Sequence, residues 1–581
     1  MARSVVAEFP WSDKKTLIYG PLASWRACFP YARSARIHPS GVHTDADFVH
    51  LRNIWTLDMN NCAMISDTAF AHLCGIHSLD ISYCHQLTDA AFVHLGGVQS
   101  LRMAECKQET ITDAAFAHLR GIRALDMSGC EQETITDAAF INLQGIDSLC
   151  MRGCTQETIT DAAFEHLRGI RTLDVSFCDQ HTITNAAFVH LCGIYELNMS
   201  ACSQFTDAAF VNLRGINTLD LSCCRGITDE AFCHLRGIRS LAMQNCNQET
   251  ITDAAFKHLR GIHSLDISGC DQRTLTDAAF AHLQGIQTLN MTYCNQETIT
   301  DAAFVHLQGI HTLDMACCSQ ETITGVAFAN LRGIHTLRIS GCRQNSIGDA
   351  AFLYLQGISK LVMAYCTQET ITSAAFAYLR GIHTLDMHGC TQETISDASF
   401  AHLKGIHTLN MSGCTQDTIT DAAFAHLRGI HTLDISKCTQ GIITDAAFAH
   451  LQGIHTLNMS KCTQGTITDA AFAQLRGIHT LNMSECTQDT ITDAAFAHLR
   501  GIHTLDMSKC TQDTITDSAF VHLRGIKKLV MSGCTQDTIT GATFVHLRGI
   551  LDWSFYNCTP IFRATVKARL RGMPLVVHSS S

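Results

Sequence analysis

"ITDAAFAHLRGIRALDMSGC", residues 111–130, is one copy of a segment that recurs along nearly the whole chain. Between residues 111 and 122 the apolar side chains recur with the period of a helix. Thr112 stands where it can cap the helix start, and Asp113 lies in the first turn, where the helix dipole favours negative charge. Arg120 and Gly121 suit the helix end. This half of the segment predicts a helix of two to three turns.

The second half of the segment changes period. Leu125 and Met127 alternate with Ala124, Asp126 and Ser128, the period of two that is typical of a short strand with one buried face. Each copy is therefore a helix, a turn and a strand. Because equivalent strands of successive copies run in the same direction, we expect a parallel sheet with the helices on its other side.

The cysteine at the end of each copy measures the repeat. From Cys62 to Cys558 these cysteines mark 22 units, mostly 24 residues apart, with steps of 22 residues from Cys62 to Cys106 and from Cys202 to Cys246. An array of this period grows in one direction without a new core. We expect one elongated domain: an N-terminal cap with a degenerate first unit (1–40), about 22 repeats (41–558) and a C-terminal cap and tail (559–581).

Every unit carries Phe at the place of Phe116 and Leu at the place of Leu119. Identical side chains in neighbouring units would contact their own copies, and burying each one contributes roughly 1.5 to 3 kcal/mol. The sequence therefore predicts that the phenylalanine row forms a structural spine.

The chain has 29 cysteines, 22 of them at the one repeat position. Each would have two identical neighbours and no unique partner, so we expect free, buried thiols in a reducing compartment, cytoplasmic or nuclear. A metal-binding row of sulfurs is the alternative, but the chain contains no CxxC pair of the kind that zinc sites use.

The pattern Ile-x-x-Leu-x-Met-x-x-Cys at Ile122, Leu125, Met127 and Cys130 resembles the leucine-rich repeat signature. With "ITD" opening the helix, it is most similar to the cysteine-containing leucine-rich repeats of F-box substrate receptors. The resemblance implies an α/β solenoid, a horseshoe or superhelical arc, with a parallel sheet on the concave face that binds other proteins and short helices on the convex face. It also implies that each cysteine side chain bonds backbone groups at the turn.

The N-terminal segment "SDKKTLIYGPLASWRACFP" resembles the second half of an F-box, with Trp25 and Arg26 as its Trp-Arg pair, but the first half is missing. Two interpretations follow. Residues 1–40 either cap the open end of the array or dock the adaptor of a cullin-type ubiquitin ligase.

Composition and motifs exclude several classes of function. The net charge of -12 argues against a nucleic-acid partner, because phosphate contacts need clustered Lys and Arg. The chain contains no apolar run of about 20 residues, the length that would predict a membrane-spanning helix. Rows of like residues do not build a catalytic site, which needs unlike groups converging on one pocket, and no nucleophile elbow, P-loop or His-Glu-x-x-His motif occurs. We therefore expect a non-enzyme without catalytic residues, cofactor or metal.

Histidine recurs at two repeat positions, those of His118 and His503. The His503 row would line up at the edge of the sheet about 5 Å apart. Stacked imidazoles there would bind a divalent metal or respond to pH, or they are solvated loop residues copied by repeat expansion.

The outward face of the strands carries Asp or Asn at the place of Asp126, flanked by Thr and Ser. An acidic, hydroxyl-rich face predicts a basic protein segment as partner. Between residues 338 and 365 this pattern is interrupted by a cation, an apolar residue and an aromatic ring, the mixture enriched at binding hot spots. The predicted partner-binding residues are Arg338, Lys360, Val362, Tyr365, Asp314, Asp386 and Tyr293.

Residues 527–533, "KKLVMSG", form a second candidate patch. The function that the pattern favours is a protein-binding scaffold. The alternatives are a ubiquitin-ligase substrate receptor and a recently expanded repeat protein without a selected partner.

Overall fold

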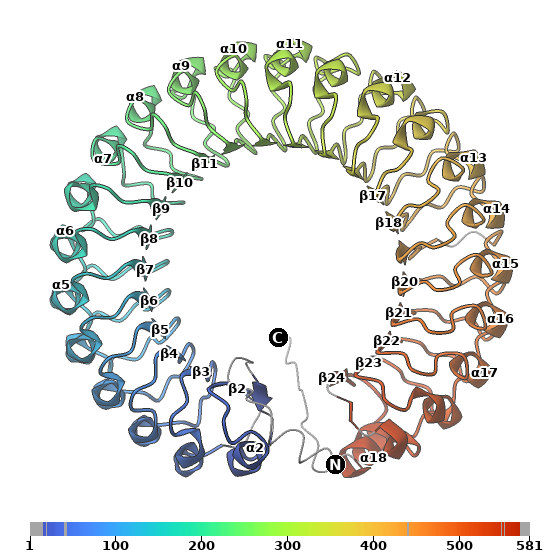
Figure 1. Cartoon of the computed structure of the whole chain (residues 1–581), viewed down its shortest axis with the longest axis horizontal. Coiled ribbons are helices and arrows are strands. Elements are labelled where there is room, and N and C mark those ends of the chain that lie inside the picture. Colours follow the sequence, from blue (N-terminus) through green and yellow to red (C-terminus); the bar gives the residue numbers. More distant parts are fainter. Residues whose placement is uncertain are drawn as a thin grey trace. The chain divides into compact units, whose positions relative to one another are not determined.

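The computed structural model describes residues 16–18, 20–39, 43–438, 441–547, 549–550 and 552–569. The chain divides into two compact units, Met1–Gln284 (unit 1) and Gly285–Ser581 (unit 2). Within each unit the strands form one layer and the short helices the other (Figure 1).

Strands of unit 1 pair in parallel in chain order, from β1 to β12. Successive copies are in register, so that Leu101 lies beside Leu125 and Leu125 beside Leu149. The strands are β1 (Thr16–Ile18), β2 (Ser34–Ile37), β3 (Thr56–Asp58), β4 (Ser78–Asp80), β5 (Ser100–Arg102), β6 (Ala124–Asp126), β7 (Ser148–Cys150), β8 (Thr172–Asp174), β9 (Glu196–Asn198), β10 (Thr218–Asp220), β11 (Ser240–Ala242) and β12 (Ser264–Asp266).

Unit 2 repeats this arrangement from β13 to β24. Its strands are β13 (Thr288–Asn290), β14 (Thr312–Asp314), β15 (Thr336–Arg338), β16 (Lys360–Val362), β17 (Thr384–Asp386), β18 (Thr408–Asn410), β19 (Thr432–Asp434), β20 (Thr456–Asn458), β21 (Thr480–Asn482), β22 (Thr504–Asp506), β23 (Lys528–Val530) and β24 (Asp552–Ser554). The predicted parallel sheet is confirmed within each unit.

The repeat helices are short, and many continue as a 3-10 turn. The α-helices of unit 1 are α2 (Leu22–Cys28), α3 (Asp89–Phe92), α4 (Asp113–Phe116), α5 (Asp137–Phe140), α6 (Asp161–Phe164), α7 (Asp207–Phe210), α8 (Asp229–Phe232), α9 (Asp253–Phe256) and α10 (Asp277–Phe280). Those of unit 2 are α11 (Asp301–Phe304), α12 (Asp349–Phe352), α13 (Asp397–Phe400), α14 (Asp421–Phe424), α15 (Asp445–Phe448), α16 (Asp469–Phe472), α17 (Asp493–Phe496) and α18 (Pro560–Arg569).

Some 3-10 turns follow an α-helix, and others take its place. The first group is η3 (Val93–Leu95), η4 (Ala117–Leu119), η5 (Ile141–Leu143), η6 (Glu165–Leu167), η8 (Val305–Leu307) and η10 (Leu353–Leu355). The second is η1 (Asp45–Leu51), η2 (Asp67–His72), η7 (Asn185–Leu191), η9 (Ala327–Leu331), η11 (Ala375–Leu379), η12 (Asp517–Leu523) and η13 (Phe544–Leu547).

The predicted caps of the repeat helix are present. Thr112 accepts a hydrogen bond from the backbone N–H of Ala114 (3.2 Å), and Gly121 adopts a φ of 83°, the left-handed conformation that glycine tolerates at a helix end. Asp113 does more than complement the dipole. Its carboxylate accepts from the backbone N–H (2.8 Å) and hydroxyl (2.7 Å) of Thr136, so it joins its helix start to the next repeat.

The core consists of the rows that the repeat predicts. Phe116, Leu119, Leu125 and Met127 are at most 2% exposed, and nearly all of their copies along the chain are buried as well. Cys130, the last residue of the segment, is fully buried and donates its S–H to the carbonyl of Met103 in the preceding repeat (3.2 Å). This backbone contact of the cysteine confirms what the resemblance implied.

The N-terminal residues that can be described pack on the first repeats. Trp25 in α2 is 7% exposed. Arg26 donates from Nε to the carbonyl of His50 (2.7 Å) and from Nη1 to that of Ala32 (3.0 Å). The Trp-Arg pair therefore stabilises the junction between α2 and the array.

Candidate functional site

We call the side of the sheet that carries Asp126 and its equivalents, away from the helices, the strand face. Each carboxylate or amide there is tied to its own turn: Asp126 accepts from the backbone N–H of Ser128 (3.1 Å), and Asn458 accepts in the same way from Ser460 (3.1 Å). An acceptor oxygen at this position thus has a structural role, because it satisfies the backbone where the strand ends.

The row on the strand face is less acidic than the sequence suggested. No more than two Asp residues are adjacent in it, and the residues between them are Asn, Arg or uncharged side chains such as Ala242 and Val362. Asn458 Nδ2 donates to Asp434 (2.7 Å), and Asn198 Nδ2 donates to Asp174 (3.3 Å).

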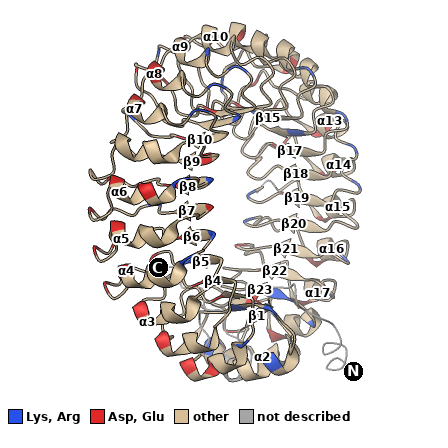
Figure 2. Ribbon diagram, turned by 60° about the vertical axis from the view of Figure 1, so that its left-hand side comes forward, with Lys and Arg blue, Asp and Glu red and all other residues tan. Residues whose placement is uncertain are grey.

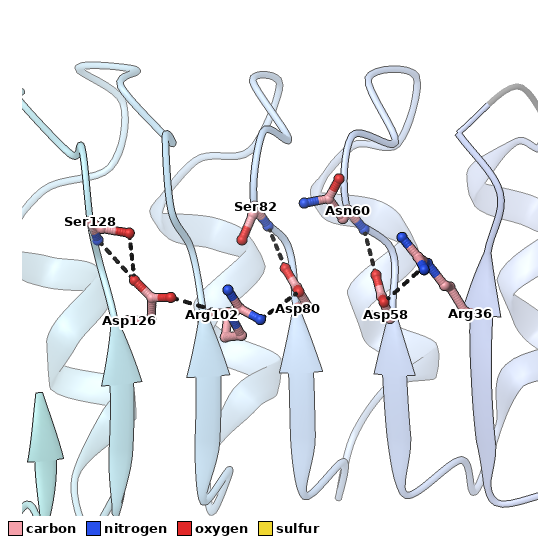
Figure 3. A network of polar contacts seen from close by, with 8 residues as sticks. All are labelled: Arg36, Asp58, Asn60, Asp80, Ser82, Arg102, Asp126 and Ser128. Carbon is pink, nitrogen blue, oxygen red and sulfur yellow. Dashed lines mark hydrogen bonds and ion pairs between the residues drawn. The ribbon is translucent and has the colours of Figure 1, made fainter. Parts of the chain in front are cut away.

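Arginines neutralise the first part of the row in unit 1 (Figure 3). Arg36 lies 3.2 Å from the carboxylate of Asp58. Arg102 lies between two carboxylates, 3.2 Å from Asp126 and 3.9 Å from Asp80. These contacts place a cation beside each of the three carboxylates and reduce the repulsion between them.

In unit 2 the strand face departs most from the repeat at β15 and β16. The register places Asp314, Arg338, Val362 and Asp386 side by side on four consecutive strands. Arg338 Nε lies 2.9 Å from Asp314, with about half of the arginine side chain (46%) still exposed. The structure thus brings these four of the predicted site residues into one row.

Lys360 and Val362 occupy the two ends of β16 and differ in exposure. Lys360 is exposed and makes no ion pair with any other described residue, whereas Val362 is only 5% exposed. The valine therefore contributes mainly to packing between its neighbours, and Lys360 is the residue of this strand that a partner would meet.

Tyr365 lies beyond β16 and is held by the next repeat. Its ring makes an edge contact with the imidazole of His388, with centroids 4.6 Å apart, and its side chain is still 54% exposed. His388 Nδ1 lies 3.0 Å from the carboxylate of Asp386. A Cβ at Gly389 would lie 2.5 Å from the Tyr365 ring, so glycine makes room for the ring in this position.

Tyr293 is 59% exposed and belongs to the same row of turn residues as Tyr365. A hydrogen bond with the Cys317 side chain in the next repeat raises its pKa. Sequence reasoning missed both Cys317 and His388. The signal was present, because His388 stands where most repeats have Ser.

Gly389→Ala should lower the thermal midpoint more than Gly413→Ala. Both glycines have a left-handed φ, of 66° and 65°, so both changes carry the same backbone strain. Only Gly389 faces the Tyr365 ring, since the nearest atom to a Cβ at Gly413 is 3.9 Å away. We expect an extra destabilisation of about 1 kcal/mol at Gly389. Equal thermal midpoints for the two variants would show that Tyr365 is not held in this position.

In the second candidate patch, residues 527–533, the lysine on β23 is paired with a carboxylate of the next repeat. Lys528 Nζ lies 2.8 Å from the carboxylate of Asp552. Because this cation is already neutralised within the chain, the patch around Lys360 is the stronger candidate.

The histidine row at the strand edge of unit 2 is stacked. Neighbouring rings from His383 to His503 have centroids 4.4 to 4.6 Å apart and planes tilted by 12° to 13°. Burial, and then the neighbouring His383 and His431, lower the pKa of His407. Among the described residues, no group of three or more His, Cys, Asp or Glu could hold a metal ion.

No family model and no curated protein matches the sequence. Solved structures do match the fold, 337 chains in all. One is the crystal structure of a TLR13–ssRNA13 complex, with a TM-score of 0.63, 17% sequence identity, and coverage of 98% of this chain and 85% of that chain. The chain therefore has the leucine-rich-repeat solenoid fold predicted from the sequence. The finer likeness to F-box receptors is not part of this result.

The comparison corrects one prediction. We excluded a nucleic-acid partner because the net charge is negative, but a protein with this fold forms a complex with ssRNA13. The exclusion was wrong because a net charge summed over a long array says nothing about the sign of its individual surfaces. Among the described residues, no helix is long and apolar enough to cross a bilayer.

Proposed function

We propose that the chain is a protein-binding scaffold and that its partner contacts the strand face of unit 2 around Arg338, Lys360 and Tyr365. The observation that carries the proposal is the double interruption of the repeat on adjacent strands, β15 and β16, next to a tyrosine that is exposed yet fixed by Gly389 and His388. A solenoid sheet of this kind offers an extended surface on which such departures distinguish one position from the rest.

The chemistry of the patch suggests what the partner presents. Lys360 is an exposed cation without a counter-ion in the described chain, and Arg338 keeps part of its guanidinium free beside Asp314. Tyr293 and Tyr365 offer exposed rings. A segment with a carboxylate toward Lys360 and an apolar side chain against the tyrosines would fit this arrangement better than the basic segment inferred from the sequence.

Restoring the repeat on β15 and β16 should weaken partner binding at least tenfold, about 1.4 kcal/mol. The variant is Arg338→Asn, Lys360→Thr, Val362→Asn. Asn is preferable to Asp at positions 338 and 362. With Asp at both positions, four carboxylates would lie side by side from Asp314 to Asp386 and would repel one another. Proteins captured by the immobilised full chain are identified by mass spectrometry, and the affinity of the one lost from the variant is then measured by titration.

The matched control is Lys528→Thr with Val530→Asn, which restores the repeat in the second patch and should leave binding unchanged. Thermal midpoints of both variants should stay close to that of the parent. If binding survives the β15–β16 variant and is lost from the control, the partner site lies at β23 instead.

The alternative function, a substrate receptor of a cullin-type ubiquitin ligase, would use residues 1–40 to dock the ligase adaptor. Burial of Trp25 and the backbone contacts of Arg26 support the cap interpretation of this segment. Capture of the purified adaptor by the full chain, with Arg26→Ala as the variant, distinguishes the two functions.

A further inference from the structure

A second surface of the molecule is formed by the loops that lead from each helix into the next strand. In unit 1 these loops carry arginine at two repeat positions, three residues apart, together with exposed aromatic rings. We call this surface of unit 1 the arginine edge. Its arginines are Arg33, Arg52, Arg120, Arg123, Arg168, Arg171, Arg214, Arg236, Arg239 and Arg260, and all are exposed.

Almost none of these arginines forms an ion pair with a carboxylate of the described chain. Arg123 is paired with Asp147 (3.3 Å), and none of the others lies within ion-pair distance of a carboxylate of the described chain. Several donate from Nε to a side chain in the next repeat instead, as Arg168 does to His190 (3.3 Å) and Arg236 to His258 (3.3 Å). Each guanidinium has five N–H donors, so most of its donors stay available to a ligand.

The opposite edge of unit 1 has the opposite charge. Exposed acidic residues follow the strands there, among them Glu109, Glu133, Glu157 and Glu249. Figure 2 shows further acidic positions in red at the starts of helices such as α5 and α6. Because all strands of the unit run in the same direction, the acidic and basic loops are separated onto different edges. The negative net charge of the chain therefore conceals a strongly basic surface.

Aromatic rings accompany the cations on the arginine edge. Tyr195 is 48% exposed and lies in the same row as Arg171, whose guanidinium is 5.8 Å from the ring centroid. Trp55 belongs to this row as well, is 49% exposed and stacks on His77 with centroids 4.4 Å apart. Cations that follow a track, interleaved with exposed rings on which bases stack, are the features of surfaces that bind single-stranded nucleic acid.

We propose that the arginine edge of unit 1 binds single-stranded nucleic acid. The arginines contact the phosphates in sequence, one or two in most repeats, and Trp55 and Tyr195 stack on bases. The exposed rings favour this partner over an acidic protein segment or the acidic edge of a second copy, because charge pairing alone gives no role to Trp55 or Tyr195. The acidic residues nearest to the track are Asp147, Glu165 and Glu196, and they interrupt it between Arg123 and Arg214.

The test uses the full chain and a fluorescein-labelled 12-nucleotide oligouridylate, with binding followed by anisotropy from 50 to 200 mM NaCl. The parent should bind, and its affinity should fall steeply with salt. Four changes, Arg168→Gln, Arg236→Gln, Arg239→Gln and Arg260→Gln, should reduce the slope of log K against log salt by about 2 to 3, since each phosphate contact on a single strand contributes about 0.7. Glutamine already occupies both repeat positions elsewhere, at Gln144 and Gln99, so the fold accepts it.

Tyr195→Ala should weaken binding about tenfold without changing the salt slope, since stacking is not ionic. The matched control changes four arginines of unit 2 that stand at the place of Arg120, as Arg428→Gln, Arg476→Gln, Arg500→Gln and Arg524→Gln. It should leave binding unchanged, because unit 2 has no arginine at the place of Arg123.

Absence of binding at 50 mM NaCl, an unaltered slope in the unit 1 variant, or an equal loss in the unit 2 variant would each overturn the proposal. So would equally tight binding of a 12-base-pair duplex that is insensitive to Tyr195→Ala. Light scattering of the free chain at 50 mM NaCl tests whether the arginine edge binds a second copy of the chain instead. Dimers that dissociate with salt, in a chain that does not bind oligouridylate, would show that it does. The β15–β16 variant should bind the oligonucleotide normally, so this result is independent of the proposed protein-binding site.

Discussion

At pH 10.5 the urea midpoint of the chain should fall below about half of its value at pH 8, because every repeat buries a thiol that cannot ionise in place. Burial raises the pKa of Cys106 to about 11 and that of Cys438, Cys486 and Cys534 to about 12. In the unfolded chain these thiols titrate near pH 9.

The direction of the effect follows from which state releases protons. Below about pH 9 the thiols are protonated in both states, and they add no pH dependence. Between pH 9 and the raised pKa only the unfolded chain ionises, so stability falls with rising pH by up to about 1.4 kcal/mol per thiol and pH unit. With one thiol in each repeat, a block of a few repeats loses most of its stability within two pH units.

The measurement is urea unfolding followed by circular dichroism at pH 8, 9, 10 and 10.5, with reductant present. Adding 0.5 M NaCl is the control, since salt screens repulsion between surface charges and leaves the desolvation of a buried thiolate unchanged. A midpoint that stays constant to pH 10.5, or that salt restores, would contradict the burial of the cysteine row.

Phe304→Ala should open the array at one place. Phe304 ends α11, is fully buried, and belongs to the row that runs through every repeat. Removing its ring leaves a cavity and costs about 3 to 5 kcal/mol. Because each repeat contacts only its neighbours, the loss is local, and the loops around residues 285–330 should become sensitive to protease.

Val305→Ala is the matched control, since Val305 is the next residue and is 52% exposed. Limited proteolysis with mass spectrometry should locate a new cleavage site close to Phe304 in the first variant and none in the second. Digestion spread evenly over the Phe304→Ala chain would show that the repeats unfold as one body.

The helices and strands could be predicted well from the sequence because the pattern that forms each of them recurs in many repeats. The switch of period between residues 122 and 125, the threonine cap and the terminal glycine recur in unit after unit, and the structure places a helix, a turn and a parallel strand accordingly. What the period could not show is how neighbouring repeats are joined. The bond from Thr136 to Asp113 connects residues 23 apart that both look like ordinary helix-start residues in the sequence.

The strand face was harder to predict for a related reason. Periodicity tells which way a side chain points, but the exposure of that side chain depends on its neighbours. Val362 points outward and is nevertheless 5% exposed between Arg338 and Asp386. The sequence showed that Asn and Arg interrupt the carboxylates of the face, but not that Asn458 donates to Asp434 or that Arg338 pairs with Asp314.

Sequence reasoning also missed the arginine edge. Its residues lie in two rows, at the places of Arg120 and Arg123. In the sequence these residues alternate with acidic ones, and the two kinds are separated only because the parallel sheet places the loops before and after each strand on different edges. A net charge of -12 averages over both.

The central claim is that the partner binds the strand face of unit 2 at β15 and β16, where the residues depart from the repeat pattern. Hydrogen exchange of the full chain, free and with its captured partner, tests this most directly. We predict protection confined to peptides that cover residues 336–366, the segment from β15 through Tyr365. Protection centred on residues 527–533, or spread evenly over the strands of unit 2, would contradict the claim.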